Sequence, residues 1–279
     1  MLCADDYAIS DAVSTGIEEL AAAGRLSATS AMVTFREWPQ HGVRLAHLRG
    51  TIAIGLHLNL TAGAPLGPMP NLAPAGTLPT IGTLSSNALR GAVDAGEIEA
   101  EALRQLVCFT EYVGHPPDFL DGHQHAHALP KVRTGVVTAL RRLGGRWPIL
   151  LRNPTERPSA IMSRGLFWRK ATMVGGLSAG FGKAARAAGH PINVGFSGFS
   201  DFKLDHPYAR ELEANFVATG PRHLMMCHPG YTDDLLATRD SVTTRRKQEL
   251  QTLLAAEHLS ERLWRPDRSK DDLWETWRD

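Results

Sequence analysis

Residues 52–60 read IAIGLHLNL, and this stretch decides the fold class. Positions 52, 54, 56, 58 and 60 are all Ile or Leu, whereas the positions between them hold Ala53, Gly55, His57 and Asn59. Successive side chains of a strand point to opposite faces, so one face of this strand is apolar and the other is small and polar. A lone histidine on a strand is more often a hydrogen-bonded core residue than a ligand. Gly55 and Asn59 favour the ligand interpretation, because they leave room and supply a hydrogen-bonding partner.

The same kind of apolar run recurs along the chain and alternates with helical patterns. We expect strands at the N-terminus up to Asp5-Asp6 and at 28–35, 52–60, 119–123, 147–151, 192–196 and 223–228. We expect helices from Ser10 or Asp11 to Gly24, and then at 43–48, 85–113 (one or two helices), 130–143, 161–173, 183–188, 208–218 and 243–263. Alternating strands and helices predict a parallel sheet, and about seven such strands suit a closed or partly closed α/β barrel.

Two further expectations concern the N-terminus and the segment that follows residue 60. Only Met1–Ala4 precede the acidic pair, so either the first strand is short or a few residues of the natural N-terminus are missing. A loop rich in Pro and Gly follows the strand at 52–60 and runs from Ala62 to about Gly82, which is long enough for an active-site lid.

Composition excludes several classes of function. The 279 residues are 43% apolar, enough for a full core, and 30 Lys and Arg balance 29 acids. We therefore expect neither nucleic acid nor an anionic membrane as a partner. The three cysteines lie far apart and predict no disulfide framework, which favours a reducing, cytoplasmic location. No apolar stretch approaches the roughly 20 residues of a membrane span, and the start lacks the layout of a signal peptide.

Three histidines stand on alternate positions in residues 119–127, which read FLDGHQHAH. They would share a face only if the strand continued, and they diverge if the chain turns after Gly122. We therefore expect only one of His123, His125 and His127 to bind a metal ion. The other two would be loop residues, substrate contacts or supports of that ligand, and Asp121 is a further candidate for support.

Further polar residues also end apolar runs. The pair Asp5-Asp6 has an alternative role, complementing the dipole of the next helix, but together with His57 and His123 it indicates a metal site. One carboxylate would then bind the ion and the other would face its water. His228 ends the run LMMCHPG and is either a strand cap or a general acid. Arg152 either orients one of the carboxylates or lies on the surface.

These segments together resemble the YdjC-like carbohydrate deacetylases, which include chitooligosaccharide deacetylases and hopanoid-biosynthesis-associated deacetylases. The matching segments are ADDYAIS at 4–10, GLHLNLT at 55–61 with GAPL at 63–66, FLDGHQHAH at 119–127 and MCHP at 226–229. The resemblance implies a distorted, TIM-like α/β barrel as a single domain, often dimeric. It further implies that Asp6, His57 and His123 hold the metal, that Asp5 is the general base and that His228 is the acid.

The chain departs from the family pattern at several positions. Tyr7-Ala8 stands where Phe-Gly is usual, and Gly122 and Gln124 stand where Ser and His are common. Because the proposed catalytic residues are intact, these changes bear on substrate choice more than on catalysis.

The sequence thus predicts a hydrolase with one divalent ion, zinc or magnesium, with manganese or cobalt also compatible. Its substrate would be an N-acetylated amino sugar, chitooligosaccharide or glycoconjugate, and acetate would be released. The alternatives are a metal-dependent barrel hydrolase or isomerase with another substrate, and a non-catalytic carbohydrate-binding protein. We expect a single domain over residues 1–279, with a charged tail from about residue 264 that packs its tryptophans on the body or on a second subunit.

Overall fold

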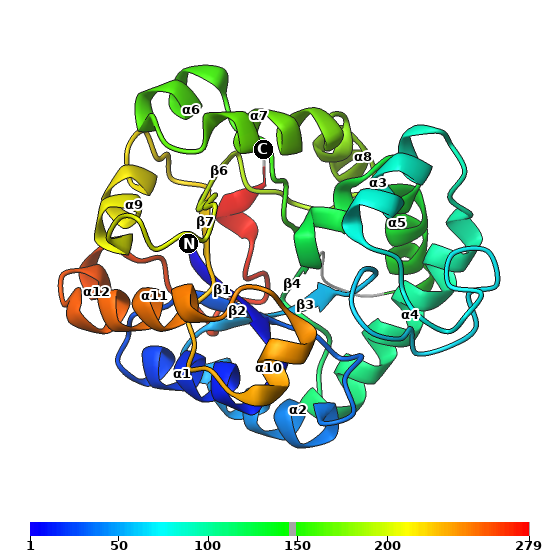
Figure 1. Cartoon of the computed structure of the whole chain (residues 1–279), viewed down its shortest axis with the longest axis horizontal. Coiled ribbons are helices and arrows are strands. Elements are labelled where there is room, and N and C mark those ends of the chain that lie inside the picture. Colours follow the sequence, from blue (N-terminus) through cyan, green and yellow to red (C-terminus); the bar gives the residue numbers. More distant parts are fainter. Residues whose placement is uncertain (145–148, 279) are drawn as a thin grey trace.

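Seven parallel strands form one sheet in the structure, a computed structural model that describes residues 1–144 and 149–278. The order across the sheet is β5-β4-β3-β2-β1-β7-β6. Figure 1 shows the strands at the centre, surrounded by helices. The strands are β1 (Leu2–Tyr7), β2 (Ala28–Ala31), β3 (Ala53–Leu58), β4 (Phe119–Gly122), β5 (Leu150–Leu151), β6 (Gly195–Ser197) and β7 (His223–Cys227).

The sheet curls until its two edges meet at a single point. A lone parallel bridge joins Leu151 in β5 to Ile192, which precedes β6. Beside it, Asn153 N donates to Asn193 Oδ1 over 2.7 Å, and Asn193 Nδ2 donates to Asn153 O over 2.8 Å. The expected parallel α/β sheet is confirmed, but the described residues form a half-barrel and no complete TIM barrel. β5 and β6 are too short for more pairing.

The two faces of the sheet pack against different apolar clusters. The outer cluster lies between sheet and helices and includes Leu2, Ile54 and Leu56. The inner cluster contains alternate strand residues together with two tryptophans of the C-terminal tail. Its strand members include Cys3, Ala28, Ala53, Phe119, Leu150, Phe196, Leu224 and Met226. The small side chains among them leave room for Trp274 and Trp277, which fill the concave side of the sheet.

Helices of the first half begin and end at residues with clear local causes. Ser10 Oγ accepts from Val13 N and caps α1, which decides between the two caps expected from the sequence, Ser10 and Asp11. Asp94 caps α4, and the region 85–113 proves to hold two helices. The elements are α1 (Asp11–Ala22), α2 (Trp38–Ala46), the 3-10 helix His47–Gly50, α3 (Ile81–Leu89), α4 (Ala95–Val113), the 3-10 segment His123–Ala128 and α5 (Val132–Leu143).

The second half is more broken than expected. Gly165, with φ +69°, separates α6 from α7, and the expected helix at 243–263 is interrupted after Ala255. α10 was not predicted; Asp233 caps it by accepting from Leu236 N. The elements are α6 (Pro158–Arg164), α7 (Trp168–Leu177), α8 (Phe181–Ala187), α9 (Tyr208–Asn215), α10 (Asp234–Arg239), α11 (Thr244–Ala255), α12 (Leu259–Arg262) and the 3-10 helix Glu275–Trp277.

Several expected boundaries are wrong. The strand expected at 28–35 ends at Ala31, and the strand expected at 192–196 covers Gly195–Ser197. The helix expected at 43–48 begins at Trp38, because Pro39 is favourable in a first helical turn. Of the strand expected at 147–151, only Leu150–Leu151 is observed, and Trp147 lies outside the described residues.

The long segment after β3 is fastened to α4. Glu97 accepts hydrogen bonds from Asn71 N at 2.7 Å and from Leu72 N at 3.0 Å. The buried Glu101 accepts from Leu66 N at 2.9 Å. The segment expected as a lid is thus held at several backbone positions by acidic side chains of one helix.

The C-terminal tail packs on the body of the same chain. Trp264 and Trp274 stack with ring centroids 5.1 Å apart. Trp274 Nε1 donates to Asp118 O over 2.7 Å, and Arg268 forms an ion pair with Asp118 at 2.7 Å. Figure 1 shows the red C-terminal segment inside the ring of helices. Among the helices of the described ranges, none has the length and apolarity needed to cross a bilayer.

Candidate active site

Polar side chains gather where the strands end on the concave side of the sheet. Each of five stands two residues beyond a member of the inner cluster, so the alternation of the strand places it on the same face. This is the carboxyl end of the parallel strands, where α/β barrels place their catalytic groups. The five are Asp5, Ser30, Asp121, Arg152 and His228, and His57 of β3 joins them.

The backbone at Asp6 explains how two adjacent carboxylates reach one site. Asp6 has φ +67°, in the left-handed region that non-glycine residues rarely adopt, and Ala8 has φ +69°. The pairing of β1 with β2 shifts register between Ala4 and Tyr7. Asp5 and Asp6 are 2% and 1% exposed. The turn therefore brings side chains that would diverge on a regular strand into one buried cluster.

Asp6, His57 and His123 converge, although they come from three separate segments. Asp6 Oδ1 lies 3.2 Å from His57 Nε2 and 3.0 Å from His123 Nδ1. One ligand-type atom from each residue lies within 4.8 Å of the others, and all three residues are buried. A carboxylate and two imidazoles form a donor set that suits a divalent ion with open positions.

The second ring nitrogen of His57, Nδ1, lies within hydrogen-bond distance of two further side chains. His57 Nδ1 lies 2.7 Å from Asp121 Oδ1 and 3.1 Å from Ser30 Oγ, and Ser30 donates to Asp121 Oδ2 over 3.0 Å. Such a carboxylate fixes the ring orientation of a ligating histidine. Burial opposes protonation, but Asp121 and Asp6 outweigh it and raise the pKa of His57 to about 10. The site therefore favours positive charge at this position.

Arg152 fixes the other carboxylate of the pair. Its Nη1 and Nη2 donate to the two oxygens of Asp5 at 2.6 Å each, and Nη2 also pairs with Asp121. The guanidinium is fully buried. Burial alone would raise the pKa of Asp5, but Arg152 outweighs it and holds that pKa well below its usual range. Arg152 thus orients Asp5 and keeps its resting carboxylate ionised, and the guanidinium does not lie on the surface.

His228 approaches Asp5 from the end of β7. Its Nε2 lies 4.0 Å from Asp5 Oδ2, and its ring makes an edge contact with Phe202 at 5.1 Å between centroids. Burial lowers the pKa of His228 to about 4, against the opposing effect of Asp6 and Asp5. The ring is therefore neutral near pH 7. The prediction of His228 as a general acid assumed the ordinary pKa of an imidazole, and this buried ring does not have that pKa.

The remaining histidines of the 119–127 segment point elsewhere, because Gln124 and His125 have φ +54° and +61°. His127 Nε2 lies 2.8 Å from the backbone oxygen of Arg152, and the His127 ring makes an edge contact with Phe181. The His125 ring makes edge contacts with Phe196 and Phe199. The structure thus separates the three rings, as expected for a chain that turns after Gly122.

The side chain of Asn59 forms hydrogen bonds within the loop that follows β3. Its Nδ2 donates to Thr34 Oγ1 and Ala62 O, both at 2.7 Å, and its Oδ1 accepts from Thr61 N and Ala62 N. Asn59 therefore turns the chain after β3, and its side chain is committed to that turn.

Three residues of the site were not predicted from the sequence. Ser30 shares the inner-face alternation and was detectable in principle. Arg246 Nη2 donates to Asp6 Oδ2 at 2.6 Å, and Glu249 Oε2 accepts from His228 N at 2.6 Å. Both lie on α11, far along the chain, and no local pattern marks them.

Charge provides a further test of whether an ion fits. The cluster holds the carboxylates of Asp5, Asp6 and Asp121 and the guanidinium groups of Arg152 and Arg246, all buried. With neutral imidazoles, the carboxylates exceed the guanidinium groups by one charge. A second set of ligand-type atoms, from Cys3, Asp5 and Asp121, is occupied by Arg152, which contacts all three. The set around Asp6 therefore fits a divalent cation better.

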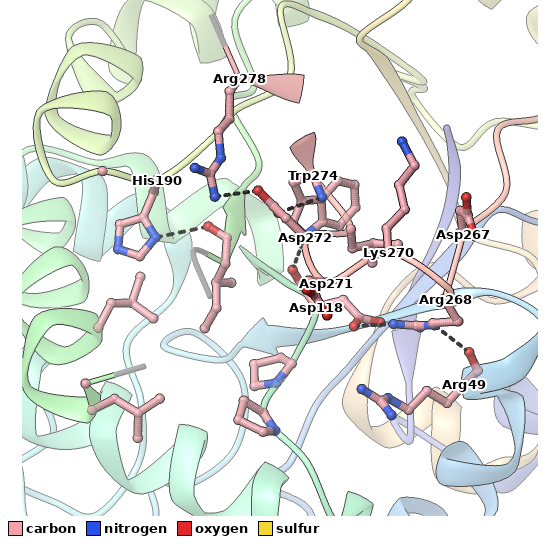
Figure 2. Close-up of a pocket in the computed structure, with 18 of the residues that line it drawn as sticks. Arg49, Asp118, His190, Asp267, Arg268, Lys270, Asp271, Asp272, Trp274 and Arg278 are labelled. Atoms are coloured by element: carbon pink, nitrogen blue, oxygen red, sulfur yellow. Dashed lines mark hydrogen bonds and ion pairs between the residues drawn. The ribbon is translucent and has the colours of Figure 1, made fainter. Parts of the chain in front are cut away.

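A cavity of about 920 Å³ lies away from these side chains. It is lined by residues that precede β3, β4 and β5 and by the tail, and so lies near the amino ends of the strands. Figure 2 shows Arg268 beside Asp118 and Arg278 beside Asp272 in its wall. Its charges are mixed and partly paired, and it includes none of the converging residues described above.

The fold and the site define a class of protein: a curled parallel α/β sheet with a buried carboxylate–imidazole cluster at the carboxyl ends of its strands. The model of the family described as YdjC-like protein matches residues 1–261, and the chain belongs to this family. The tail beyond residue 261 lies outside the match.

Named relatives and a solved structure resemble the chain over most of its length. A human protein named "Carbohydrate deacetylase" is 31% identical over 250 residues, covering 83% of this chain and 74% of that protein. A Klebsiella pneumoniae protein named "Chitooligosaccharide deacetylase" is 29% identical over 254 residues, covering 91% and 89%. A crystal structure of a "putative cellobiose-phosphate cleavage protein" from Enterococcus faecalis has a TM-score of 0.67 at 21% identity, covering 94% and 93%, which supports the fold.

Proposed function

We propose that this chain is a metal-dependent hydrolase that removes the acetyl group from the nitrogen of an amino sugar, chitooligosaccharide or glycoconjugate and releases acetate. The observation that carries the proposal is the convergence of Asp6, His57 and His123 next to Asp5 and His228. The names of the family relatives, carbohydrate and chitooligosaccharide deacetylase, support the substrate class.

Asp6, His57 and His123 would hold the ion, and Asp121 would keep His57 in position. When bound, a divalent ion supplies a Lewis acid for the amide carbonyl and lowers the pKa of a water molecule. The donor set accepts zinc, and with further water ligands also magnesium, manganese or cobalt.

The residues of the chain would move the protons. Asp5, held ionised by Arg152, accepts a proton from the attacking water. His228 begins as a neutral ring, so it can protonate the departing amine only after it has itself received a proton. Asp5 Oδ2 lies 4.0 Å from His228 Nε2, so a small approach of the two groups would bring them within hydrogen-bond distance and let Asp5 pass the proton on. Water thus supplies the hydroxyl of the acetate and a proton of the amine.

An acetate-release assay tests this function. The purified protein, freed of metal by chelation and reloaded with one divalent ion at a time, is incubated with N-acetylglucosamine oligomers. Phosphate esters and acetate esters of sugars serve as competing substrate classes. We expect acetate release from the N-acetylated oligomers that depends on the added ion. Ion-dependent hydrolysis of the phosphate or ester substrates alone would favour a different hydrolase, and ligand binding without turnover would indicate a carbohydrate-binding protein.

A further inference from the structure

Arg246 connects the helix α11 to the candidate metal ligand Asp6. Its side chain is fully buried. Nη2 donates to Asp6 Oδ2 at 2.6 Å and to Asp240 Oδ2 at 2.5 Å, and Nε donates to Val242 O at 2.8 Å. The guanidinium is thus fixed by two residues of the segment between α10 and α11.

The two oxygens of Asp6 consequently have different surroundings. Oδ1 faces His57 Nε2 and His123 Nδ1 at 3.2 Å and 3.0 Å. Oδ2 is bound to Arg246. A free carboxylate can bind an ion through one oxygen or through both, whereas a carboxylate whose second oxygen accepts a short charge-assisted hydrogen bond has only one to offer.

We propose that Arg246 is a positioning residue that restricts Asp6 to a single coordinating oxygen. A second oxygen from Asp6 would take up a coordination position that a catalytic site keeps open for water and substrate. Arg246 therefore keeps that coordination position open for the water and the substrate of the proposed hydrolysis. This inference rests on the proposed metal site, and it adds a residue that no local sequence pattern marks.

The adjacent Arg245 provides a matched control. It is also buried on α11, but its Nη2 pairs with Glu211 and its Nη1 donates to His206 O at 2.9 Å. Replacing either arginine by methionine removes one buried guanidinium from the same helix. Only the change at residue 246 frees Asp6 Oδ2.

The test uses cobalt(II), whose visible d–d absorption weakens as its coordination number rises. The full-length chain, its Arg246→Met variant and its Arg245→Met variant are freed of metal and loaded with cobalt to equal occupancy, which is checked by metal analysis. We expect the Arg246→Met protein to lose d–d intensity relative to the unchanged chain, because Asp6 binds through both oxygens. The Arg245→Met protein should keep the original spectrum.

Two spectral results would overturn the inference: an Arg246→Met spectrum equal to that of the unchanged chain, or the same change in both variants. If Arg246→Met does not fold, Arg246→Gln, which keeps a donor for Asp240 without the charge, replaces it with the same expectation. If neither variant folds while Arg245→Met does, Arg246 maintains the fold and the positioning role is wrong. An unchanged chain that takes up no cobalt would refute the metal site itself, which separates the two failures.

Discussion

At the scale of single residues, one backbone torsion decides whether the first strand can supply two carboxylates to the same site. Asp6 adopts φ +67°, a conformation that costs a residue with a Cβ roughly 1–3 kcal/mol unless its surroundings maintain it. The ion pair with Arg246 and the contacts with His57 and His123 are such surroundings. Asp5 consequently remains free to pair with Arg152 and to face His228.

Replacing Asp5 by asparagine should abolish acetate release while metal binding continues. The amide cannot accept a proton from water, and loss of a general base typically lowers the rate by roughly 10²–10⁴-fold. Metal analysis and acetate assays on the same preparations check this. Asp201→Asn, at the exposed Asp201, is the control and should keep normal turnover. Acetate release at the original rate from a fully loaded Asp5→Asn protein would show that Asp5 is not the base.

Glu249 should make stability depend on pH. Burial raises its pKa from 4.5 to about 7, against the hydrogen bond from His228 N. The folded state then binds more protons than the unfolded state between these values, so stability falls as pH rises from 4.5 to 7. Glu249→Gln keeps an acceptor for His228 N but cannot ionise. Its stability advantage over the original chain should grow by about 3 kcal/mol between pH 4.5 and 8, measured by urea unfolding. Parallel stability curves for the two proteins would contradict the prediction.

At the scale of elements, the inner face of β3 is matched to its neighbour β4. Gly55 pairs with Phe119 in register, and His57 pairs with Asp121. A Cβ at Gly55 would lie 2.6 Å from the Phe119 ring. The absence of a side chain at Gly55 thus lets the Phe119 ring fill the concave side directly below His57.

Gly55→Ala should therefore destabilise the protein by roughly 1–3 kcal/mol, as overpacking of a core does. Gly175→Ala is the control, because nothing lies within 4 Å of a Cβ there and alanine is the better helix former by roughly 0.5–1 kcal/mol. Chemical unfolding of both variants checks the difference in sign. Equal stability of Gly55→Ala and the original chain would mean that Phe119 can move away at no cost.

Local patterns predicted the parts of the molecule that depend on local chemistry. The alternation at 52–60 identified the face of His57, and the segments around Asp5, His123 and His228 each end an apolar run. The short β5 and β6 and the incomplete barrel depend on how distant edges meet, which alternation does not encode. Arg246 and Asp6 are 240 residues apart, so no periodicity links them. The left-handed backbone at Asp6 was likewise beyond a pattern of residue types.

At the scale of the whole molecule, the C-terminal tail completes the inner core. Trp274 and Trp277 belong to the same apolar cluster as Cys3 and Ala53, and Trp274 is bonded to Asp118 O just before β4. The concave side is thus closed by the tail near the amino ends of the strands and carries the polar cluster at the carboxyl ends. The side chains that complete the core and the side chains of the candidate active site thus lie at opposite ends of the sheet.

Trp274→Ala should cost about 3–5 kcal/mol of stability, the usual range for removing a large buried aromatic side chain. Trp168→Ala, at a residue 45% exposed, should change stability by less than about 0.5 kcal/mol. Thermal and urea unfolding check both. Unfolding of Trp274→Ala at the original midpoint would show that the tail contributes nothing to the core.

The central claim is that side chains from three distant segments hold one divalent ion, and the amount of metal bound per chain tests it most directly. Metal analysis after dialysis against zinc, magnesium, manganese or cobalt should give a single tightly held equivalent for the original chain and for His47→Ala, a change at an exposed histidine away from the cluster. His57→Ala and His123→Ala should lose that equivalent. Retention of the full amount by both variants, or no uptake of any of these ions by the original chain, would contradict the account.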